Sequence, residues 1–316
     1  MSLKVEGITK LFGDTKAVDN VSFEIDKPSV VGFLGPNGAG KTTTMRIITG
    51  FLSPTGGKVV IDGETVDANN YGLRSRIGYL PESNPLYTEL EVHEYLKFTG
   101  QLAGLPPRKT NERLDYVVER CGLREVLYEP IYRLSKGYKQ RVGLAQAIIH
   151  DPEILILDEP SSGLDPNQVI GIRQLISELA TEKFVVLSTH ILSEVQALCT
   201  RVLIINKGRL VLDATSDELQ HSGTGSVAVL IKAAGEADAA ASAFQDALQP
   251  RKLTLDREGE LISLHLAIED SNDVREKIFD ICVANGFKIL GLSSSGSDLE
   301  KIFRELTVGS DETGQQ

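Results

Sequence analysis

The sequence contains no tryptophan, 2 methionines and only 3 cysteines among its 316 residues. The cysteines Cys121, Cys199 and Cys282 are odd in number and far apart, so they indicate neither a disulfide framework nor a zinc site. They fit a protein of the reducing cytosol. No apolar run approaches the roughly 18 residues of a membrane span, and the first residues lack the apolar core of a signal peptide. We therefore expect neither secretion nor direct insertion into a membrane.

Basic residues are also scarce, with 33 Lys and Arg against 44 Asp and Glu and a formal net charge of −11. Such an acidic chain is poorly suited to wrapping nucleic acid or coating an anionic membrane surface, so we expect no nucleic-acid partner. Hydrophobic residues make up 41% and charged residues 24%, which excludes a disordered or collagen-like chain. The length leaves room for about two domains.

The domain boundary is predicted from a small, polar segment. His221-Ser-Gly-Thr-Gly-Ser226 indicates a linker at 221–226, between a first domain at 1–220 and an accessory domain at 227–308. Residues 309–316 contain no apolar side chain and are predicted to form a flexible tail.

The first domain has the pattern of an α/β fold. Short strands are expected at 3–8 and 21–25. Continuous apolar runs, typical of strands covered on both faces, follow at 30–34, 154–157, 184–187 and 202–205. Helical periodicity is seen at 41–49, 167–180 and 191–199. From about 83 to 147 the pattern is mostly helical, which predicts a helical subdomain inserted into the α/β core.

The second domain follows a different order. Its elements alternate as strand, helix, strand, strand, helix, strand, at 227–231, 237–248, 252–256, 261–266, 273–285 and 288–293. This order is that of a small ferredoxin-like α+β domain. A last helix is expected at 298–306.

A phosphate-binding loop follows the strand at 30–34. Gly35-Pro-Asn-Gly-Ala-Gly-Lys-Thr42 matches the P-loop pattern, in which inward-pointing backbone N–H groups and a helix N-terminus hold a polyphosphate. Lys41 would reach the β- and γ-phosphates, and the Thr42 hydroxyl would bind Mg²⁺. The alternative is a glycine-rich turn, but the strand–loop–helix context favours ATP. The predicted nucleotide-binding residues here are Gly35, Asn37, Gly38, Ala39, Gly40, Lys41, Thr42 and Thr43.

Two carboxylates end the strand at 154–157. Since strand C-termini of an α/β sheet face the ligand crevice, Asp158 is predicted to bind Mg²⁺ and Glu159 to polarise a water against the γ-phosphate. The alternative for an Asp-Glu pair is a solvated strand end. The P-loop weakens that alternative because it supplies the phosphate that the carboxylates need.

Several further motifs occur in one order over residues 1–220, and together they resemble the ATP-binding-cassette (ABC) ATPases. Leu134-Ser-Lys-Gly-Tyr-Lys-Gln-Arg141 resembles the family signature, and Ser162-Gly-Leu-Asp165 resembles the D-loop. The resemblance implies that Phe12 stacks on adenine and that His190 contacts the γ-phosphate and orients water. It also implies a homodimer, in which Ser135 and Gly137 of one copy, at a helix expected from about Gln140, close on the ATP of the other. Asp165 belongs to the same nucleotide site.

Alternatives remain for these residues when each is taken singly. Ser135 also suits the N-cap of a basic helix, a role compatible with anion binding. His190 alone suits a packed histidine, and Phe12 a core position. The chain also departs from the family pattern. Glu82 stands where a glutamine is usual and is expected near Mg²⁺, while Lys136 and Tyr138 replace common signature residues.

The details resemble the multidrug/ABC-2 class of exporters, and most closely its gliding-motility-associated ATPase subunit. The resemblance implies ATP hydrolysis coupled to a separate ABC-2-type integral membrane permease, with the chain in the cytoplasm on the inner face of the cell membrane. The nitrous-oxide-reductase maturation ATPase, which shares the Pro-Glu variant, is an alternative. A cassette acting on ribosomes or DNA, or an ATP-sensing regulator, is disfavoured by the single P-loop and by Glu159 with His190.

Overall fold

The computed structural model describes residues 1–67, 69–221, 225–232, 237–258, 261–268, 274–295 and 299–308. The chain divides into two compact units, Met1–Ser216 and Asp217–Gln316. The predicted tail and residues 222–224 of the predicted linker lie outside the described residues. Gly225 and Ser226 of that linker instead begin a strand, because the ladder pairs them with Ile268 and Ala267. Among the helices that the structure describes, none has the length and apolar character needed to span a bilayer.

An antiparallel sheet opens the first unit, with the strand order β2-β1-β4-β5. Its strands are β1 (Leu3–Phe12), β2 (Thr15–Ile25), β4 (Gly56–Ile61) and β5 (Glu64–Thr65). β1 extends beyond its predicted end at residue 8, and β2 begins before its predicted start at residue 21. The added residues were missed because they are partly exposed and lack the apolar alternation of a half-buried strand.

A second sheet carries the predicted apolar strands, in the order β10-β9-β3-β8-β7-β6. The five strands from β9 to β6 run parallel, and β10 pairs antiparallel to β9 at one edge. The strands are β3 (Ser29–Leu34), β6 (Ile77–Leu80), β7 (Ile154–Asp158), β8 (Phe184–Thr189), β9 (Arg201–Asn206) and β10 (Arg209–Thr215). The carboxyl ends of β3, β7 and β8 therefore meet at one edge of the sheet.

Helix α1 (Lys41–Ile48) contacts strands of both sheets, and its buried Met45 belongs to the same apolar core as Phe23 and Phe33. Neighbouring residues of a strand point to opposite faces, so Gly32 faces away from that core. There it lies against Cys199, at the end of α7 (Leu192–Leu198). Helices thus cover both faces of the central strand that leads into the P-loop.

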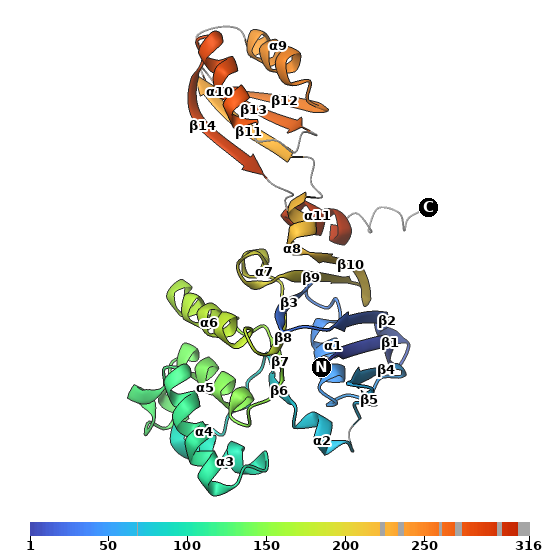
Figure 1. Ribbon diagram of the computed structural model, residues 1–316, viewed down its shortest axis with the longest axis vertical. Coiled ribbons are helices and arrows are strands. Elements are labelled where there is room, and N and C mark those ends of the chain that lie inside the picture. Colours follow the sequence, from blue (N-terminus) through green and yellow to red (C-terminus); the bar gives the residue numbers. More distant parts are fainter. Residues whose placement is uncertain are drawn as a thin grey trace. The chain divides into compact units, whose positions relative to one another are not determined.

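The segment between β6 and β7 forms a helical lobe beside the edge strand β6 (Figure 1). It contains α3 (Val92–Leu102), α4 (Pro107–Arg120) and α5 (Lys136–Ile148), with two short 3₁₀ turns at Arg124–Val126 and Ile131–Arg133. The other helices up to residue 221 are α2 (Tyr71–Arg74), α6 (Pro166–Leu179) and α8 (Ser216–His221). α5 begins at Lys136, earlier than the predicted start near Gln140, because Ser135 caps it there.

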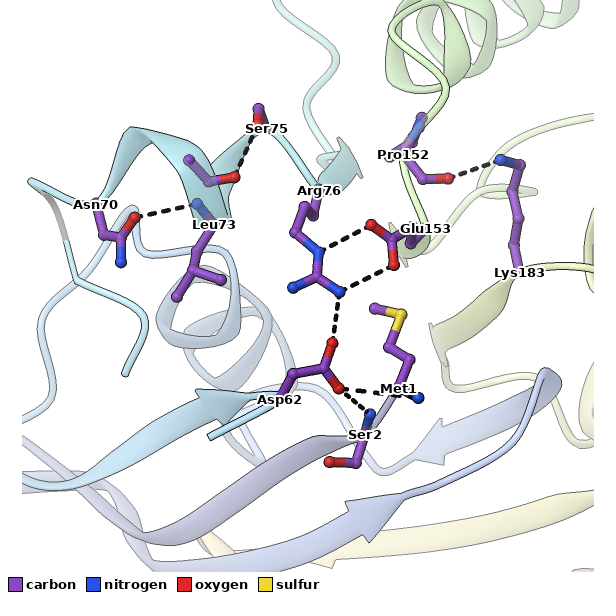
Figure 2. A network of polar contacts seen from close by, with 11 residues as sticks. Met1, Ser2, Asp62, Asn70, Leu73, Ser75, Arg76, Pro152, Glu153 and Lys183 are labelled. Atoms are coloured by element: carbon purple, nitrogen blue, oxygen red, sulfur yellow. Dashed lines mark hydrogen bonds and ion pairs between the residues drawn. The ribbon is translucent and has the colours of Figure 1, made fainter. Parts of the chain in front are cut away.

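A polar network ties the two sheets together at the amino-terminal ends of β6 and β7 (Figure 2). The Arg76 guanidinium donates from Nε and Nη2 to Glu153 at 2.8 and 2.9 Å and from Nη2 to Asp62 at 2.6 Å. Asp62, just after β4, also accepts from the Ser2 backbone N–H at 2.7 Å. Both carboxylates raise the pKa of Arg76. The network lies at the opposite end of β7 from Asp158.

The second unit has the predicted strand–helix order. Its elements are β11 (Gly225–Lys232), α9 (Ala237–Leu248), β12 (Lys252–Glu258), β13 (Leu261–Ile268), α10 (Arg275–Ala284), β14 (Lys288–Ser295) and α11 (Leu299–Val308). The strand order is β12-β13-β11-β14, with every neighbouring pair antiparallel. This is the split-βαβ, ferredoxin-like arrangement. Its core packs Val229 and Leu264 of the sheet against Phe244 of α9 and Ile278 of α10.

Candidate functional site

The P-loop joins β3 to α1 through backbone conformations that favour glycine. Gly40 has φ 106°, and a Cβ there would lie 2.5 Å from the Ala17 carbonyl oxygen. A Cβ at Gly35 would lie equally close, at 2.5 Å, to the Ile205 carbonyl oxygen. Asn37, Gly38 and Ala39 complete the loop, and Thr43 lies in the first turn of α1. The loop therefore exposes backbone, rather than side chains, in front of a helix N-terminus.

Lys41 is only 6% exposed, and its ammonium lies over the P-loop. Nζ donates to the Gly35 and Pro36 carbonyl oxygens at 2.8 and 3.2 Å. It also lies 3.5 Å from Glu159 Oε1. A buried cation with these partners adds positive charge to the field of the α1 N-terminus, which suits a polyphosphate.

Asp158, the last residue of β7, is fully buried. The Ser188 hydroxyl donates to its Oδ1, whereas its Oδ2 has no hydrogen-bond partner among the described residues. Burial raises the pKa of the Asp158 carboxyl, against the opposing hydroxyls of Ser188 and Thr42, and the charges of Glu82 and Glu159 add to the rise. An orphaned carboxylate oxygen beside a threonine hydroxyl is a hard-oxygen donor set that fits Mg²⁺.

The protein alone supplies an incomplete metal shell. In the part of the chain that the structure describes, no three His, Cys, Asp or Glu side chains gather so that they could hold a metal ion. Phosphate and water oxygens would have to complete a Mg²⁺ shell, as is usual for this ion. Glu82 lies just beyond β6. Burial and the charge of Asp158 raise the pKa of Tyr79 to about 12, and Glu82 contributes to the same shift, so these three groups share one neighbourhood.

Glu159 is buried between a cation and a histidine. Its Oε2 lies 2.9 Å from His190 Nδ1 and its Oε1 3.5 Å from Lys41 Nζ. Its backbone has φ 50°, a left-handed conformation that is uncommon outside glycine and concentrates at functional sites. The backbone N–H donates to the Ser188 carbonyl at 3.0 Å and holds this turn in place. A carboxylate so placed can accept a proton from water.

The His190 side chain is 47% exposed, so its ring also meets solvent. An ionised Glu159 can only accept, so a hydrogen bond in this contact needs a proton on His190 Nδ1. The contact with the γ-phosphate that the resemblance implies would use the other ring nitrogen, Nε2. The arrangement thus suits a histidine that orients Glu159 or accepts from a water.

The structure brings together five of the predicted residues at the carboxyl ends of β3, β7 and β8, namely Lys41, Thr42, Asp158, Glu159 and His190. Phe12 lies elsewhere, at the end of β1. Its side chain is 51% exposed, with Lys10 Nζ 5.4 Å from the ring centroid. An exposed ring at a strand end is available for stacking on a base.

Ser135 and Gly137 lie at the start of α5, in a cavity whose lining includes neither Lys41 nor Glu159. The Ser135 hydroxyl accepts from the Tyr138 backbone N–H at 3.3 Å, as an N-cap. A Cβ at Gly137 would meet the Gln168 amide at 2.5 Å. These residues line a cavity of about 540 Å³, together with Gly122, Arg124, Glu125, Tyr138, Arg141 and Gln168.

Asp165 also serves as a helix N-cap in this structure. Its carboxylate accepts from the Gln168 backbone N–H at 3.0 Å and starts α6, with Pro166 in the first helical position. The cap holds the Gln168 residue whose amide covers Gly137. Two of the predicted nucleotide contacts, Ser135 and Asp165, therefore have a structural role within their own chain.

The sequence profile of the ABC transporter family matches residues 18–162. The chain is 43% identical over 210 residues to an uncharacterized ABC transporter ATP-binding protein of Methanocaldococcus jannaschii, a match that covers 66% of this chain and 76% of that protein. The chain belongs to the ABC transporter family. It is therefore an ATP-binding subunit of the kind that hydrolyses ATP and works with a membrane permease.

Other relatives of this ATP-binding subunit carry more specific names. It is 30% identical over 310 residues to the linearmycin resistance ATP-binding protein LnrL of Bacillus subtilis, covering 96% of this chain and 98% of LnrL. It is 38% identical over 220 residues to the bacitracin transport ATP-binding protein BcrA of Bacillus licheniformis, covering 69% and 71%. A solved ATP-binding subunit of an ABC transporter superposes with a TM-score of 0.64 at 29% identity, covering 70% of this chain and 93% of that one.

Sequence reasoning missed several polar residues around the site of this subunit. Ser188 bonds Asp158, while Ser161, Thr189 and Glu194 form a buried cluster behind Glu159 and His190. The signal for Ser188 and Thr189 was available, since both hydroxyls stand at the carboxyl end of an apolar strand, directly before His190. Glu194 gave no signal, because a glutamate in the first turn of a helix is usually a solvated residue favoured by the helix dipole.

Proposed function

We propose that this subunit hydrolyses ATP to drive export through a separate ABC-2-type membrane permease. The full-length likeness to LnrL carries the proposal, because it extends beyond the ATP-binding unit into the residues after 216. The name of BcrA, which denotes bacitracin transport, supports a transport role. The contacts of the buried Glu159 with Lys41 and His190 support hydrolysis rather than ATP sensing alone.

In the proposed reaction the water oxygen attacks the γ-phosphorus while the bond to the β–γ bridging oxygen breaks. Glu159 accepts a proton of the attacking water, and His190 holds the carboxylate in place. Lys41 and the P-loop N–H groups hold the phosphates, and Phe12 stacks on adenine. Thr42 and Asp158, with Glu82 nearby, would hold Mg²⁺, which when bound neutralises charge on the β- and γ-phosphate oxygens.

The proposed working unit is a homodimer. Ser135 and Gly137 line an open cavity at the start of a 13-residue helix, and Lys41 of their own chain is not part of that lining. In the dimer these residues close on the γ-phosphate of the partner's ATP, where the helix N-terminus stabilises negative charge. Asp165, at the start of α6, belongs to the same nucleotide site in this proposal.

In this proposal the subunit contacts the permease at the cytoplasmic face of the cell membrane. We propose that the helical subdomain at 83–147 transmits the nucleotide state to it and that residues 227–308 form an accessory domain. On motif likeness alone, gliding motility is a subsidiary proposal for the biological process. A nitrous-oxide-reductase maturation role is the alternative, favoured by Glu82 in place of glutamine.

The test is co-expression with the product of a neighbouring gene that encodes about six hydrophobic spans. We expect the two chains to co-purify in detergent, and the permease to stimulate ATP hydrolysis in proteoliposomes. A complex that carries Glu159→Gln is the control and should bind ATP without transport. Co-purification with ribosomes or DNA, together with no association with any membrane protein, would contradict the proposal and favour a soluble ABC ATPase.

A further inference from the structure

Glu194 is a buried acid behind the hydrolytic site. It lies in the first turn of α7 and is only 2% exposed. A carboxylate in such surroundings is costly unless it is hydrogen-bonded. Its Oε1 accepts from the Ser161 hydroxyl, and its Oε2 accepts from the Thr189 hydroxyl at 2.6 Å. Both donors are themselves buried, at 6% and 0% exposure.

The two hydroxyls belong to the two chain segments that carry Glu159 and His190. Ser161 follows Glu159 by two residues, within a turn in which the Ser162 N–H donates to the Glu159 carbonyl at 3.1 Å. Thr189 directly precedes His190, and its hydroxyl accepts from the Ile191 N–H at 3.0 Å. One carboxylate therefore bridges the backbones on either side of the contact between Glu159 and His190.

We propose that Glu194 is a positioning residue for hydrolysis. By holding Ser161 and Thr189 at a fixed separation, it sets how Glu159 and His190 face each other and the attacking water. This inference rests on the roles proposed above for Glu159 and His190. The physical reason is that small misplacements of a reacting group lower the rate steeply. The P-loop meets Thr189 through the backbone, where the Gly35 N–H donates to the Thr189 carbonyl at 3.4 Å, so we expect phosphate binding to persist when the side-chain contacts of Glu194 are removed.

The two hydrogen bonds that Glu194 accepts can be removed singly or together by substitution. Both hydroxyls now donate to Glu194, and the Thr189 oxygen already accepts from the Ile191 N–H. Glu194→Gln keeps the shape but presents a donor to one hydroxyl, which must turn to accept. Glu194→Ala removes both contacts. Ser161→Ala and Thr189→Val each remove one.

We expect kcat to fall about 10-fold in Glu194→Gln and about 100-fold in Glu194→Ala, with the KM for ATP changed by less than about 2-fold. Ser161→Ala and Thr189→Val should each fall between wild type and Glu194→Ala. Combining Glu194→Gln with His190→Ala should cost less than the product of the two single losses, because both act on the same contact.

Glu153→Gln is the matched control. Glu153 flanks the opposite end of β7, where it pairs with Arg76 (Figure 2), so its loss should lower the unfolding temperature and leave kcat unchanged. Glu159→Gln is the reference for the proposed site. Should it retain wild-type turnover, the roles of the site residues are wrong.

Should Glu159→Gln be inactive while Glu194→Gln, Ser161→Ala and Thr189→Val all keep wild-type kcat, the positioning inference alone is overturned. A loss of kcat matched by an equal loss of ATP affinity, or additive losses in the combined variant, would also overturn it and leave Glu194 a purely structural residue. If Glu194→Ala does not fold, the other three variants decide the question.

Discussion

Asp158 carries a buried carboxyl oxygen that has no hydrogen-bond partner among the residues the structure describes, and its raised pKa predicts how the nucleotide-free protein responds to pH. Well below the ordinary aspartate pKa the group is protonated whether the chain is folded or unfolded, and it has no effect. As pH rises from the ordinary value to the raised one, the unfolded chain loses this proton more readily than the folded one. The free energy of unfolding therefore falls across that window and stays lower above it.

Asp158→Asn should remove this penalty. We expect it to raise the unfolding temperature of the nucleotide-free protein at neutral pH by about 2–4 °C, the shift that roughly 1 kcal/mol gives at this size. The gain should shrink toward acid pH. The same variant should lose Mg²⁺-dependent hydrolysis. Differential scanning calorimetry at several pH values is the measurement, and an unchanged or lower unfolding temperature at pH 7 would show that the orphaned oxygen is not a cost.

A substitution of Glu82 provides a second test of the proposed Mg²⁺ site. Its charge adds to the pKa shifts of Asp158 and Tyr79, so it lies close enough to act on a cation bound there. Glu82→Gln restores the residue usual in the family and removes one negative charge. We expect the Mg²⁺ concentration for half-maximal hydrolysis to rise about 10-fold, while the apparent ATP affinity at saturating Mg²⁺ changes less. Superimposable Mg²⁺ titrations would remove Glu82 from the metal site.

Individual site residues could be predicted from the sequence where they follow a recognisable strand. Lys41, Asp158, Glu159 and His190 all stand directly after an apolar strand or its loop, and strands of a parallel sheet bring such ends together. The partners of Glu194 could not be predicted in this way. Ser161 lies 33 residues away in the chain, and the burial of a glutamate in a first helical turn is decided by tertiary packing.

At the scale of the element, two substitutions at the start of helix α5 distinguish the capping role of Ser135 from its proposed role at the partner's γ-phosphate. Ser135→Ala removes the N-cap and should lower stability by about 1 kcal/mol. Ser135→Asp keeps a good N-cap but brings a negative charge toward the partner's γ-phosphate. We expect Ser135→Asp to keep the wild-type unfolding temperature and to lose most hydrolysis. If capping were the only role, Ser135→Asp would be as active as wild type, which paired melting and ATPase measurements will reveal.

Element prediction succeeded where burial is complete and failed where it is partial. The strands β3, β7, β8 and β9 are nearly fully buried and read as apolar runs. Strands β4, β5, β6 and β10 were missed, because only half of β4 is buried, β5 and β6 are too short for periodicity to be detected, and β10 has no fully buried residue. The start of α5 was placed late because Lys-Gly-Tyr at 136–138 lacks an apolar period, although the capping serine was visible.

For the molecule as a whole, the fold of each unit followed from the order of its elements. The second unit was predictable because a strand–helix order with six elements leaves few right-handed topologies open to it. Its role was not predictable, because function resides in sites rather than in folds. The P-loop in the first unit is such a site, and the proposed reaction also needs Ser135 and Gly137 of a second copy.

Because one chain holds only part of the proposed ATP site, we expect two copies to assemble. Lys41 and Glu159 lie in one cluster, while Ser135 and Gly137 line a separate cavity, so each proposed ATP site needs a second copy. ATP bound between two copies stabilises the dimer by mass action, and cleavage releases it. In Glu159→Gln the bound ATP persists, since the amide keeps the shape of the base but cannot accept a proton from water.

We therefore expect sedimentation velocity at micromolar protein to show a dimer of Glu159→Gln with ATP and Mg²⁺, and a monomer without nucleotide. Adding Ser135→Asp to the same chain should return it to a monomer, because the new charge opposes the partner's γ-phosphate. A dimer that forms equally well without ATP, or one that survives the added charge, would place the contact elsewhere on the molecule.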